Sequence, residues 1–377
     1  MKLIKNLFNQ KNILKEVLSI FVISRLLIIF IGYLSNLVII KSRWFSSFPR
    51  PDSLLNLFFK WDSQWYMSIV RNGYSYNPGE ESNVAFFPLY PMLIRFFSSI
   101  FGNPKLMGFV ISNIVLLLAA IYLYKLIILD FEDPKIASKT VFYMLIFPLS
   151  FFFSIFYTEG LFLFLAISSF YYGRKKQWLT ASVLGFFLSL TRSLGVLIFI
   201  PLLIEYLGIN FKTFKINLKA IKKDILYLLL IPAGLFSYIY YLHIKFNDAF
   251  AFSHTQAAWN RKFTSIFTTI SNTGYFSSFY KIIFLGSIIF ALILILYLIY
   301  SRSRFSYIIY SSLLLFCYLS TGLLESIPRY ISVLFPIYLG MSLLANRDKF
   351  LDHFFTLFSV MLLTLFTILF VNGYWFT

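Results

Sequence analysis

The chain has 377 residues, of which 59% are hydrophobic, 21% aromatic and only 13% charged. Soluble proteins carry about 25% charged residues, so this composition excludes an ordinary soluble globular protein. Repeated apolar runs of about 17–25 residues between short polar breaks are typical of membrane-spanning helices, which satisfy their backbone polar groups inside lipid. We therefore expect an all-α polytopic membrane protein in which residues 1–377 form a single integral membrane domain.

The net charge of +18, from 33 Lys and Arg against 15 Asp and Glu, does not indicate nucleic acid as a partner. The basic residues lie mainly in short loops between apolar runs, where they act as an orientation signal. The single cysteine, Cys317, lies in an apolar run, which excludes a disulfide framework and a thiolate metal site. The first apolar run is too long for a removable signal peptide and lacks a small-residue cleavage site.

The first apolar run is followed by the longest polar interruption in the chain. Four lysines in residues 1–16 place the N-terminus in the cytoplasm, and the first span is expected over residues 17–40. This span contains Arg25, which we expect to reach back to the cytoplasmic headgroups, with a functional role as the alternative. Residues 41–105 then form a long external loop, with an amphipathic segment at 54–71 along the interface.

The later apolar runs predict a second span, two short hairpins and five further spans. They are expected over residues 106–129, 138–156, 160–173, 178–191, 194–207, 225–243, 280–300, 305–324, 331–346 and 351–373. This gives about eleven crossings, with the C-terminus outside and a second external loop at 244–279. The acidic cluster at 130–133 is interpreted as solvated residues at a helix start. Because the hairpin segments are short for a bilayer, we expect them to surround a cavity that Glu159 and Arg192 face.

This topology brings charged side chains together at the external ends of the spans. They are Asp62, Glu159, Asp248, Glu325, Arg192, Arg261, Arg329 and His254. Carboxylates with arginines at a membrane surface suit two tasks, the passage of ions or protons and the handling of a phosphate-bearing lipid. Arginine favours phosphate because its planar guanidinium donates hydrogen bonds as a fork. Asp62 stands out because it lies between Trp61 and Trp65; the alternative is a solvated aspartate in an interfacial aromatic belt.

Several classes of site are absent from the sequence. It contains no glycine-rich phosphate loop, no His-x-x-x-His pair and no Gly-x-Ser-x-Gly elbow. His243 and His254 are eleven residues apart and His353 is expected near the opposite face, which argues against a histidine metal site. We expect no cofactor and no metal site. A divalent metal ion is nevertheless left open, because Asp248 or Glu159 can approach Asp62 in space.

A set of short motifs occurs in order along the chain. They are Trp61-Asp62-Ser63-Gln64-Trp65-Tyr66, Phe87-Pro88-Leu89-Tyr90-Pro91, Ser154-Ile155-Phe156-Tyr157-Thr158-Glu159, Thr191-Arg192-Ser193, the stretch from Asp248 through Gln256 and Trp259 to Arg261, and Pro328-Arg329-Tyr330. Together they resemble the PIG-V family, whose eukaryotic members are the second mannosyltransferase of GPI-anchor assembly. The resemblance covers residues 20–345, and Arg25 in the first span also fits it.

The resemblance implies a GT-C-type glycosyltransferase fold and a polyprenyl-phosphate sugar as donor. It implies an inverting transfer in which Asp62 is the catalytic base, a role worth roughly 10²–10⁴-fold in rate. The leaving phosphate gains charge and needs a cation, so Arg192, Arg329 and Arg261 are the expected donor phosphate-binding residues. The expected substrate-binding residues are Trp61, Trp65, Tyr66, Glu159, Asp248, Gln256 and Trp259.

The acceptor does not follow from the resemblance. The chain is rich in Phe, Ile and Lys and reads as a prokaryotic member, and such an organism need not make GPI anchors. We therefore expect a mannosyltransferase of the cell membrane, with an extracytoplasmic active site and a lipid-linked or glycan acceptor.

Simpler roles are open for two of these residues, and other functions for the whole protein. Arg329 follows a proline and serves equally as an anchor at the headgroups, while Asp248 beside Asn247 fits a turn residue. A transporter or flippase of lipid-linked saccharides would use the same arginines, but it favours internal repeats that the sequence does not show. The third alternative is a non-catalytic assembly subunit, whose function would not depend on Asp62.

Overall fold

The structure is a computed structural model that describes residues 2–39, 53–209, 221–272 and 276–374. No strand occurs in these ranges, so the all-α prediction is confirmed for them. The α-helices are α1 (Lys2–Val38), α2 (Leu54–Leu57), α3 (Asp62–Asn72), α4 (Leu89–Phe101), α5 (Pro104–Phe131), α6 (Pro134–Ile146), α7 (Glu159–Arg174), α8 (Trp178–Ser189), α9 (Phe199–Leu207), α10 (Leu230–Phe246), α11 (Ala251–His254), α12 (Ile266–Ser271), α13 (Ser278–Tyr300), α14 (Phe305–Leu319), α15 (Ile327–Ile331), α16 (Pro336–Arg347) and α17 (Lys349–Val371). The short 3-10 helices include η1 (Asn83–Ala85), η2 (Ser150–Phe153), η3 (Ser193–Ile198), η5 (Lys223–Leu229) and η6 (Thr255–Trp259). The first part of the expected external loop, up to residue 52, lies outside the described residues.

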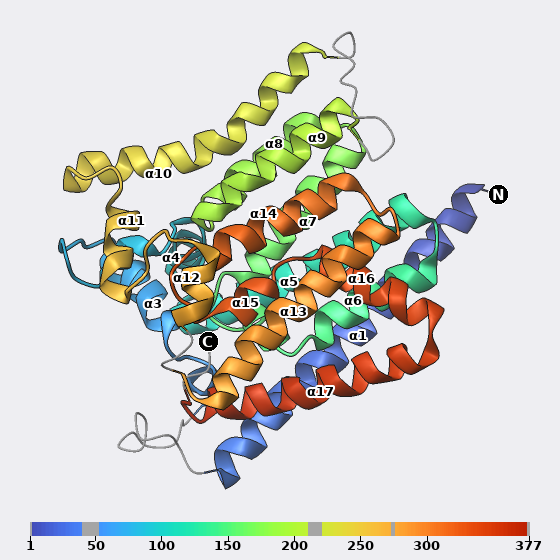
Figure 1. Ribbon diagram of the computed structural model, residues 1–377, viewed down its shortest axis with the longest axis horizontal. Coiled ribbons are helices and arrows are strands. Elements are labelled where there is room, and N and C mark those ends of the chain that lie inside the picture. The colour runs from blue at the N-terminus through green and yellow to red at the C-terminus, as the bar shows by residue number, and fades with distance from the viewer. Residues whose placement is uncertain (1, 40–52, 210–220, 273–275, 375–377) are drawn as a thin grey trace.

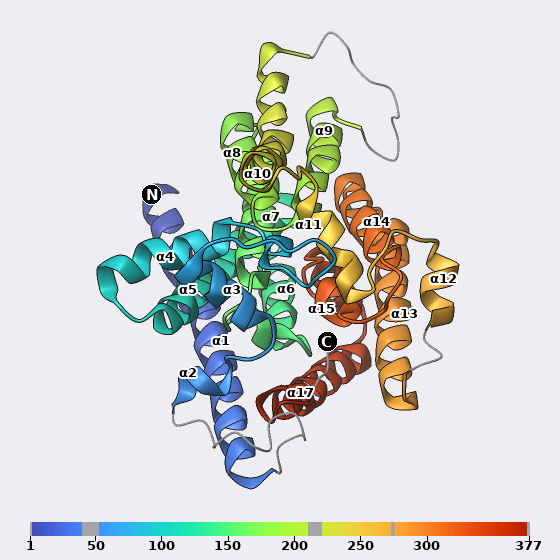
Figure 2. The ribbon, with the colours of Figure 1, turned by 90° about the vertical axis from the view of Figure 1, so that its left-hand side faces the viewer.

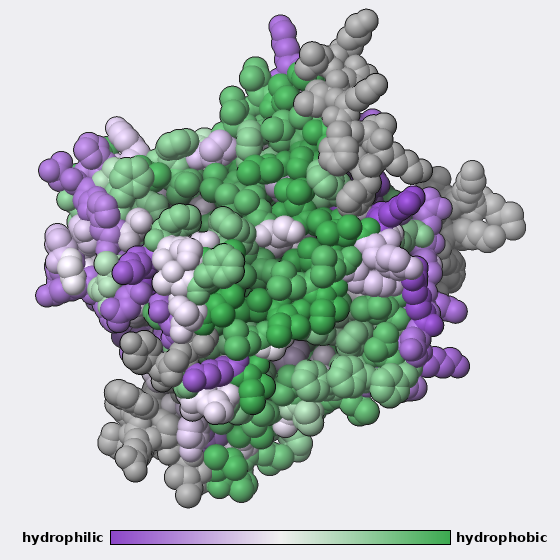
Figure 3. Space-filling view, in the orientation of Figure 1, coloured by the Kyte–Doolittle hydropathy of each residue, from purple (hydrophilic) through white to green (hydrophobic). Residues whose placement is uncertain are grey.

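A broad apolar band separates two polar ends of the molecule. Figure 3 shows this band across the middle of the view, with hydrophilic residues gathered at its left and right. Five helices are long and apolar enough to cross a membrane: Lys15–Val38, Pro104–Phe131, Lys223–Phe246, Ser278–Tyr300 and Lys349–Val371. The protein is therefore a membrane protein. Other apolar helices such as α8 and α14 have only 10–17 residues, so the total of about eleven crossings remains a prediction.

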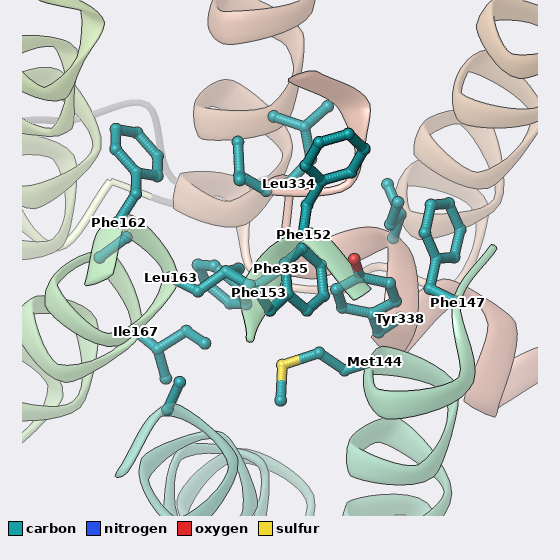
Figure 4. Close-up of a cluster of buried hydrophobic side chains, with 14 of the residues drawn as sticks. Met144, Phe147, Phe152, Phe153, Phe162, Leu163, Ile167, Leu334, Phe335 and Tyr338 are labelled. Carbon is teal, nitrogen blue, oxygen red and sulfur yellow. The ribbon is translucent and has the colours of Figure 1, made fainter. Parts of the chain in front are cut away.

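Aromatic and aliphatic side chains fill the centre of the bundle, next to segments that carry charged side chains. Phe152 and Phe153 of η2 pack with Phe335 and Tyr338 beside the start of α16, and all four side chains are fully buried (Figure 4). The Phe335 ring also meets Phe170 of α7 edge-on, with 5.3 Å between the ring centres. Because this core joins η2, α7 and α16, it fixes the neighbouring segments that carry charged side chains into the interior.

Arg25 does not reach the headgroups, so that prediction is wrong. Its side chain is buried, and Nη1 donates to the carbonyl of Ser150 and to Ser154 Oγ, each at 2.8 Å. Nη2 donates to the carbonyl of Leu145 at 2.5 Å. The chain leaves the α-helical path between α6 and η2, and carbonyls at a helix end lack intrahelical partners. Arg25 supplies those partners and thereby holds the break in place.

The acidic cluster at 130–133 divides into two roles. Asp133 caps α6 as expected, since its Oδ1 accepts from the backbone N–H of Lys135 at 2.8 Å. Asp130 is not solvated, because its side chain is 2% exposed. It accepts hydrogen bonds from Nε of Arg174 at 2.9 Å and Nε of Arg304 at 2.6 Å, and from the Tyr307 hydroxyl. This carboxylate therefore ties α5 to α7 and α14 at the end of the bundle opposite α3 (Figure 1).

Asp130→Asn is expected to lower the free energy of unfolding by about 2 kcal/mol. Removing one partner from a fully buried ion pair costs about 3–5 kcal/mol, and the partial exposure of Arg174 and Arg304 reduces that figure. Denaturant unfolding of the purified protein in mixed micelles measures the loss. Glu132→Gln is the matched control, because Glu132 is exposed two residues away. Equal free energies of unfolding for the two variants would show that the buried cluster around Asp130 does not contribute to stability.

Candidate active site

The predicted site residues come from segments that are far apart in the sequence. The segments are α3, the start of α7, the turn before η3, the turn after η6, and α15. Figure 1 shows α3, α11 and α12 at the same end of the bundle, the end that faces the viewer in Figure 2, and Figure 3 shows that this end is polar. The ion pairs described next bring together four of the eight charged residues predicted to share one face, Asp62, Glu159, Arg192 and Arg329, whereas Asp248 and His254 form a separate pair. That this face is external stays a prediction.

Asp62 is the first residue of α3, where the helix dipole favours a carboxylate. The chain turns into this helix through Trp61, which has a φ of 53°, a conformation that side chains other than glycine rarely adopt. The Tyr157 hydroxyl donates to the carbonyl of Lys60 at 3.1 Å and anchors the turn. Asp62 Oδ2 accepts from Nη1 of Arg329 at 2.7 Å, and the Asp62 side chain is 31% exposed. It is therefore an ion-paired carboxylate, not a solvated belt residue.

Glu159 connects two arginines from inside the protein. Its side chain is fully buried at the first residue of α7, and Oε1 pairs with Nη2 of Arg192 and lies 3.5 Å from Nε of Arg329. Arg329 is 8% exposed, so its alternative role as a headgroup anchor is wrong. Asp62, Arg329, Glu159 and Arg192 thus form a continuous chain of charges, which we call the ion-pair chain. Burial of this kind costs free energy unless charges are paired, which is why Glu159 is essential to the arrangement.

The ion-pair chain has unused hydrogen-bonding groups. Within the described residues, Nη1 of Arg192 and Oε2 of Glu159 are buried without a hydrogen-bond partner. Nε of Arg192 is fixed by Thr158 Oγ1 at 2.8 Å, and that oxygen also lies 3.3 Å from the Tyr66 hydroxyl. Buried polar groups are normally satisfied, so orphaned ones at a charged site indicate that a polar ligand completes it.

The turn that presents Arg192 requires a glycine three residues later. A Cβ at Gly195 would lie 2.2 Å from the carbonyl oxygen of Leu188. Gly195→Ala is therefore expected to push η3 away from α8, displace Arg192 and destabilise the protein by about 1–3 kcal/mol. Gly286→Ala is the control, since a Cβ there meets nothing within 4 Å and should be neutral or slightly stabilising. Thermal unfolding of both variants checks this, and an unchanged Gly195→Ala would contradict the close approach.

Arg261 approaches the ion-pair chain from the segment that follows η6. Its backbone N–H donates to the carbonyl of Gln256 at 3.0 Å, and Nη2 donates to the carbonyl of Glu325 at 3.2 Å. Its guanidinium lies 5.6 Å from the ring centre of Tyr330, a ring that Arg329 also approaches, at 5.4 Å. The three predicted phosphate-binding arginines therefore do meet. Gln256 takes part through its backbone carbonyl, which accepts the hydrogen bond that shapes the turn carrying Arg261.

The predicted aromatic residues form a half-buried group beside the ion-pair chain. Trp65 stacks on Phe86 with 5.9 Å between ring centres and meets Trp259 edge-on at 5.7 Å. Trp65 lies three residues after Asp62, and residues three apart share a face of a helix. Tyr66 lies deeper, buried edge-on against Tyr90. Trp61, at the strained turn, packs against the hydrophobic core.

Asp248 stands apart from this assembly. Its Oδ2 accepts from the Tyr76 hydroxyl at 2.9 Å and lies 2.8 Å from Nδ1 of His254, while Oδ1 accepts from the N–H of Phe250 at 3.0 Å. Burial alone raises the pKa of Asp248, but these hydrogen bonds outweigh it and lower that pKa below its ordinary value. Among the described residues, no hydrogen bond or ion pair joins Asp248 to the ion-pair chain. The alternative reading as a turn residue is confirmed, and a substrate contact stays a prediction.

With all groups ionised, three arginines and two carboxylates give this site one net positive charge. Arginine side chains fixed by carboxylates are preorganised to bind an anion without first reordering, and phosphate matches their fork of donors. Among the described residues, no group of three or more His, Cys, Asp or Glu side chains is placed to hold a metal ion. The arrangement is therefore suited to bind an anion beside a carboxylate.

Two contributors were not assigned from the sequence. Thr158 fixes Arg192, and Tyr330 lies among the arginines. Both occur within the motifs, each next to a charged residue that was assigned. The signal was thus present, but hydroxyl groups in apolar surroundings are common and carry little information by themselves.

Comparisons with known proteins add three findings. The family described as mannosyltransferase (PIG-V) matches residues 14–259. A search of curated proteins finds no match. Among solved structures, the chain is similar to an oligosaccharyltransferase from Archaeoglobus fulgidus in its apo form, with 14% identity, a TM-score of 0.47 and coverage of 95% of this chain and 56% of that one.

Two further crystal structures of the same oligosaccharyltransferase give similar values. The complex with Zn and sulfate has 15% identity and a TM-score of 0.45, covering 94% of this chain and 52% of that one. The form tethered to an acceptor peptide has 13% identity and a TM-score of 0.47, covering 95% and 55%. The chain thus spans about half the length of that enzyme. The family match covers more than half of the chain, and the protein belongs to the mannosyltransferase (PIG-V) family.

Proposed function

We propose that this protein is a membrane mannosyltransferase that uses a polyprenyl-phosphate sugar as donor. It transfers the sugar with inversion to a lipid-linked or glycan acceptor, and the site faces the extracytoplasmic side of the cell membrane. The observation that carries the proposal is the ion-pair chain, in which Asp62 and Glu159 hold two arginines at the polar end of a PIG-V family member.

Asp62 is proposed as the base. Its Oδ2 is engaged by Arg329, and Oδ1 makes no hydrogen bond to another described residue. Oδ1 takes the proton of an acceptor hydroxyl as that oxygen attacks the anomeric carbon of the donor sugar. The bond from this carbon to the phosphate oxygen breaks, and its electron pair leaves with the phosphate. A positioned base of this kind contributes roughly 10²–10⁴-fold.

The phosphate is proposed to lie against the arginines farther from the base. Inversion requires the attacking and leaving oxygens on opposite sides of the anomeric carbon. Nη1 of Arg192 has no hydrogen-bond partner among the described residues. Nη2 of Arg261 donates to a backbone carbonyl, which carries no full negative charge. Both guanidinium groups are therefore available to an anion. Arg329 lies between Asp62 and Glu159, where it orients the base and adds to the positive field on the leaving group.

The aromatic group beside α3 is proposed to receive the substrates. Trp65 lies within one helical turn of Asp62, and its half-buried ring meets that of Trp259, so a sugar ring or a lipid chain can pack against the pair. The transporter reading gains no support from the family match, and no internal repeat favours it. Loss of sugar transfer on substitution of Asp62 would exclude the alternative that the protein is a non-catalytic assembly subunit.

The test is sugar transfer by purified protein in detergent micelles. The donor is polyprenyl-phosphate mannose with a radiolabelled sugar, the acceptor is a lipid extract of the host membrane, and Asp62→Asn is the comparator. Labelled product from the wild type alone supports the proposal. A detergent micelle does not separate two compartments, so the formation of labelled product measures sugar transfer and not transport. Donor binding without product in any acceptor fraction would overturn the enzyme assignment, and assays with and without EDTA test for a metal requirement.

A further inference from the structure

Tyr330 follows Arg329 in α15 and lies among all three arginines of the site. The guanidinium carbons of Arg329, Arg261 and Arg192 lie 5.4, 5.6 and 5.8 Å from the centre of its ring. At these distances the negative face of an aromatic ring attracts a cation. Because the three arginines come from separate segments, their shared contact with one ring sets the spacing between them.

The Tyr330 ring is itself fixed. It stacks on Tyr318 of α14 with 4.8 Å between ring centres and 23° between the ring planes. The Tyr330 hydroxyl makes no hydrogen bond to another described residue. Burial alone raises the pKa of Tyr330, but the field of Arg261, Arg329 and Arg192 outweighs burial and lowers that pKa below its ordinary value. The ring is thus held rigidly in a strongly positive environment with a free O–H group.

Resting on the function proposed above, we propose that Tyr330 is a further donor-binding residue whose hydroxyl donates a hydrogen bond to a non-bridging phosphate oxygen while its ring spaces the three arginines. A neutral phenol suits this place for an electrostatic reason. Another carboxylate would repel the phosphate, and another arginine would repel the three already present. The O–H adds a donor without adding charge, and the phosphate supplies the acceptor that it lacks.

This assignment predicts how donor binding responds to alkaline pH. The charged and titratable groups that face the ring are Arg192, Arg261, Arg329, Asp62 and Tyr318. Below its pKa the phenol is neutral and donates to phosphate. Above it, the phenolate pairs with the arginines and competes with phosphate, so KM for the donor rises. Because the arginines lower this pKa, the rise begins below the ordinary tyrosine range of about 10.

The first experiment measures binding without catalysis. Farnesyl phosphate, a short isoprenoid phosphate, is expected to raise the Tm of the wild type, with farnesol as the control that lacks phosphate. Tyr330→Phe, which keeps the ring, should need about tenfold more farnesyl phosphate for the same shift. Tyr240→Phe is the matched control, since Tyr240 is 66% exposed on α10. No shift in the wild type, or an equal one with farnesol, would overturn the phosphate site itself, whereas equal shifts in wild type and Tyr330→Phe would overturn the role of Tyr330 alone.

The second experiment separates the hydroxyl from the ring. In the transfer assay, Tyr330→Phe should raise KM for the donor about tenfold, leave kcat nearly unchanged and remove the alkaline rise of KM. Tyr330→Leu removes the ring as well, so its KM should rise further. A KM and pH profile of Tyr330→Phe equal to those of the wild type, with a defect only in Tyr330→Leu, would show that the ring is a spacer and overturn the hydrogen bond to phosphate.

Discussion

Asp62→Asn is expected to lower kcat for sugar transfer about a thousandfold and to leave the fold intact. Asparagine has the shape of aspartate, and its carbonyl oxygen still accepts a hydrogen bond from Arg329, which lies 2.7 Å from Asp62 Oδ2. It is not basic enough to take a proton from an attacking hydroxyl, so the loss falls within the roughly 10²–10⁴-fold range of general base catalysis. Initial rates over donor concentration measure it, and KM for the donor should change little.

Two further variants show whether the carboxylate itself matters. Asp62→Glu keeps the base but moves it by one methylene, so partial activity is expected because catalysis depends on position. Glu81→Gln removes an exposed carboxylate from the segment between α3 and η1 and should be as active as the wild type. Unchanged kcat in Asp62→Asn would exclude Asp62 as the base and direct attention to Glu159, the other carboxylate of the ion-pair chain.

The helices of this protein were predictable because apolar run length is a strong signal. The expected spans at 106–129 and 280–300 agree with α5 and α13 to within two residues at each end. The interior charges were harder to read. Arg25 was expected at the headgroups, because a sequence does not show that the break after α6 leaves carbonyls inside the bundle for it to bind.

The members of the site were predictable, but their pairing was not. Turns between apolar runs placed Asp62, Glu159 and the arginines at one end, where the structure has them. The sequence separates Asp62 from Arg329 by 267 positions, so nothing local indicates that they form an ion pair. Asp130 is a second example. From the sequence, a carboxylate at a helix end is predicted to be solvated, and only the packing of the helices shows that it is buried.

Glu159→Gln is expected to reduce both stability and activity, because this carboxylate neutralises buried cations. Its Oε1 is the carboxylate partner of Arg192 among the described residues, and it also lies 3.5 Å from Nε of Arg329. Leaving a buried charge unpaired costs about 3–5 kcal/mol, and disordered arginines no longer stabilise the leaving phosphate. We expect the free energy of unfolding to fall by about 3 kcal/mol and kcat/KM by about 10²–10³-fold, measured by denaturant unfolding and by the transfer assay.

A second substitution separates these two effects of Glu159. In Glu159→Gln combined with Arg192→Met, the cation that lost its partner is also gone, so stability should recover while transfer remains low. Glu205→Gln is the control at the opposite end of the bundle, where Glu205 pairs with Arg174 at 3.5 Å. It should lose stability without losing transfer. If the double variant recovered activity together with stability, Arg192 would be excluded from phosphate binding, and the charges of Arg261 and Arg329 would suffice for the leaving group.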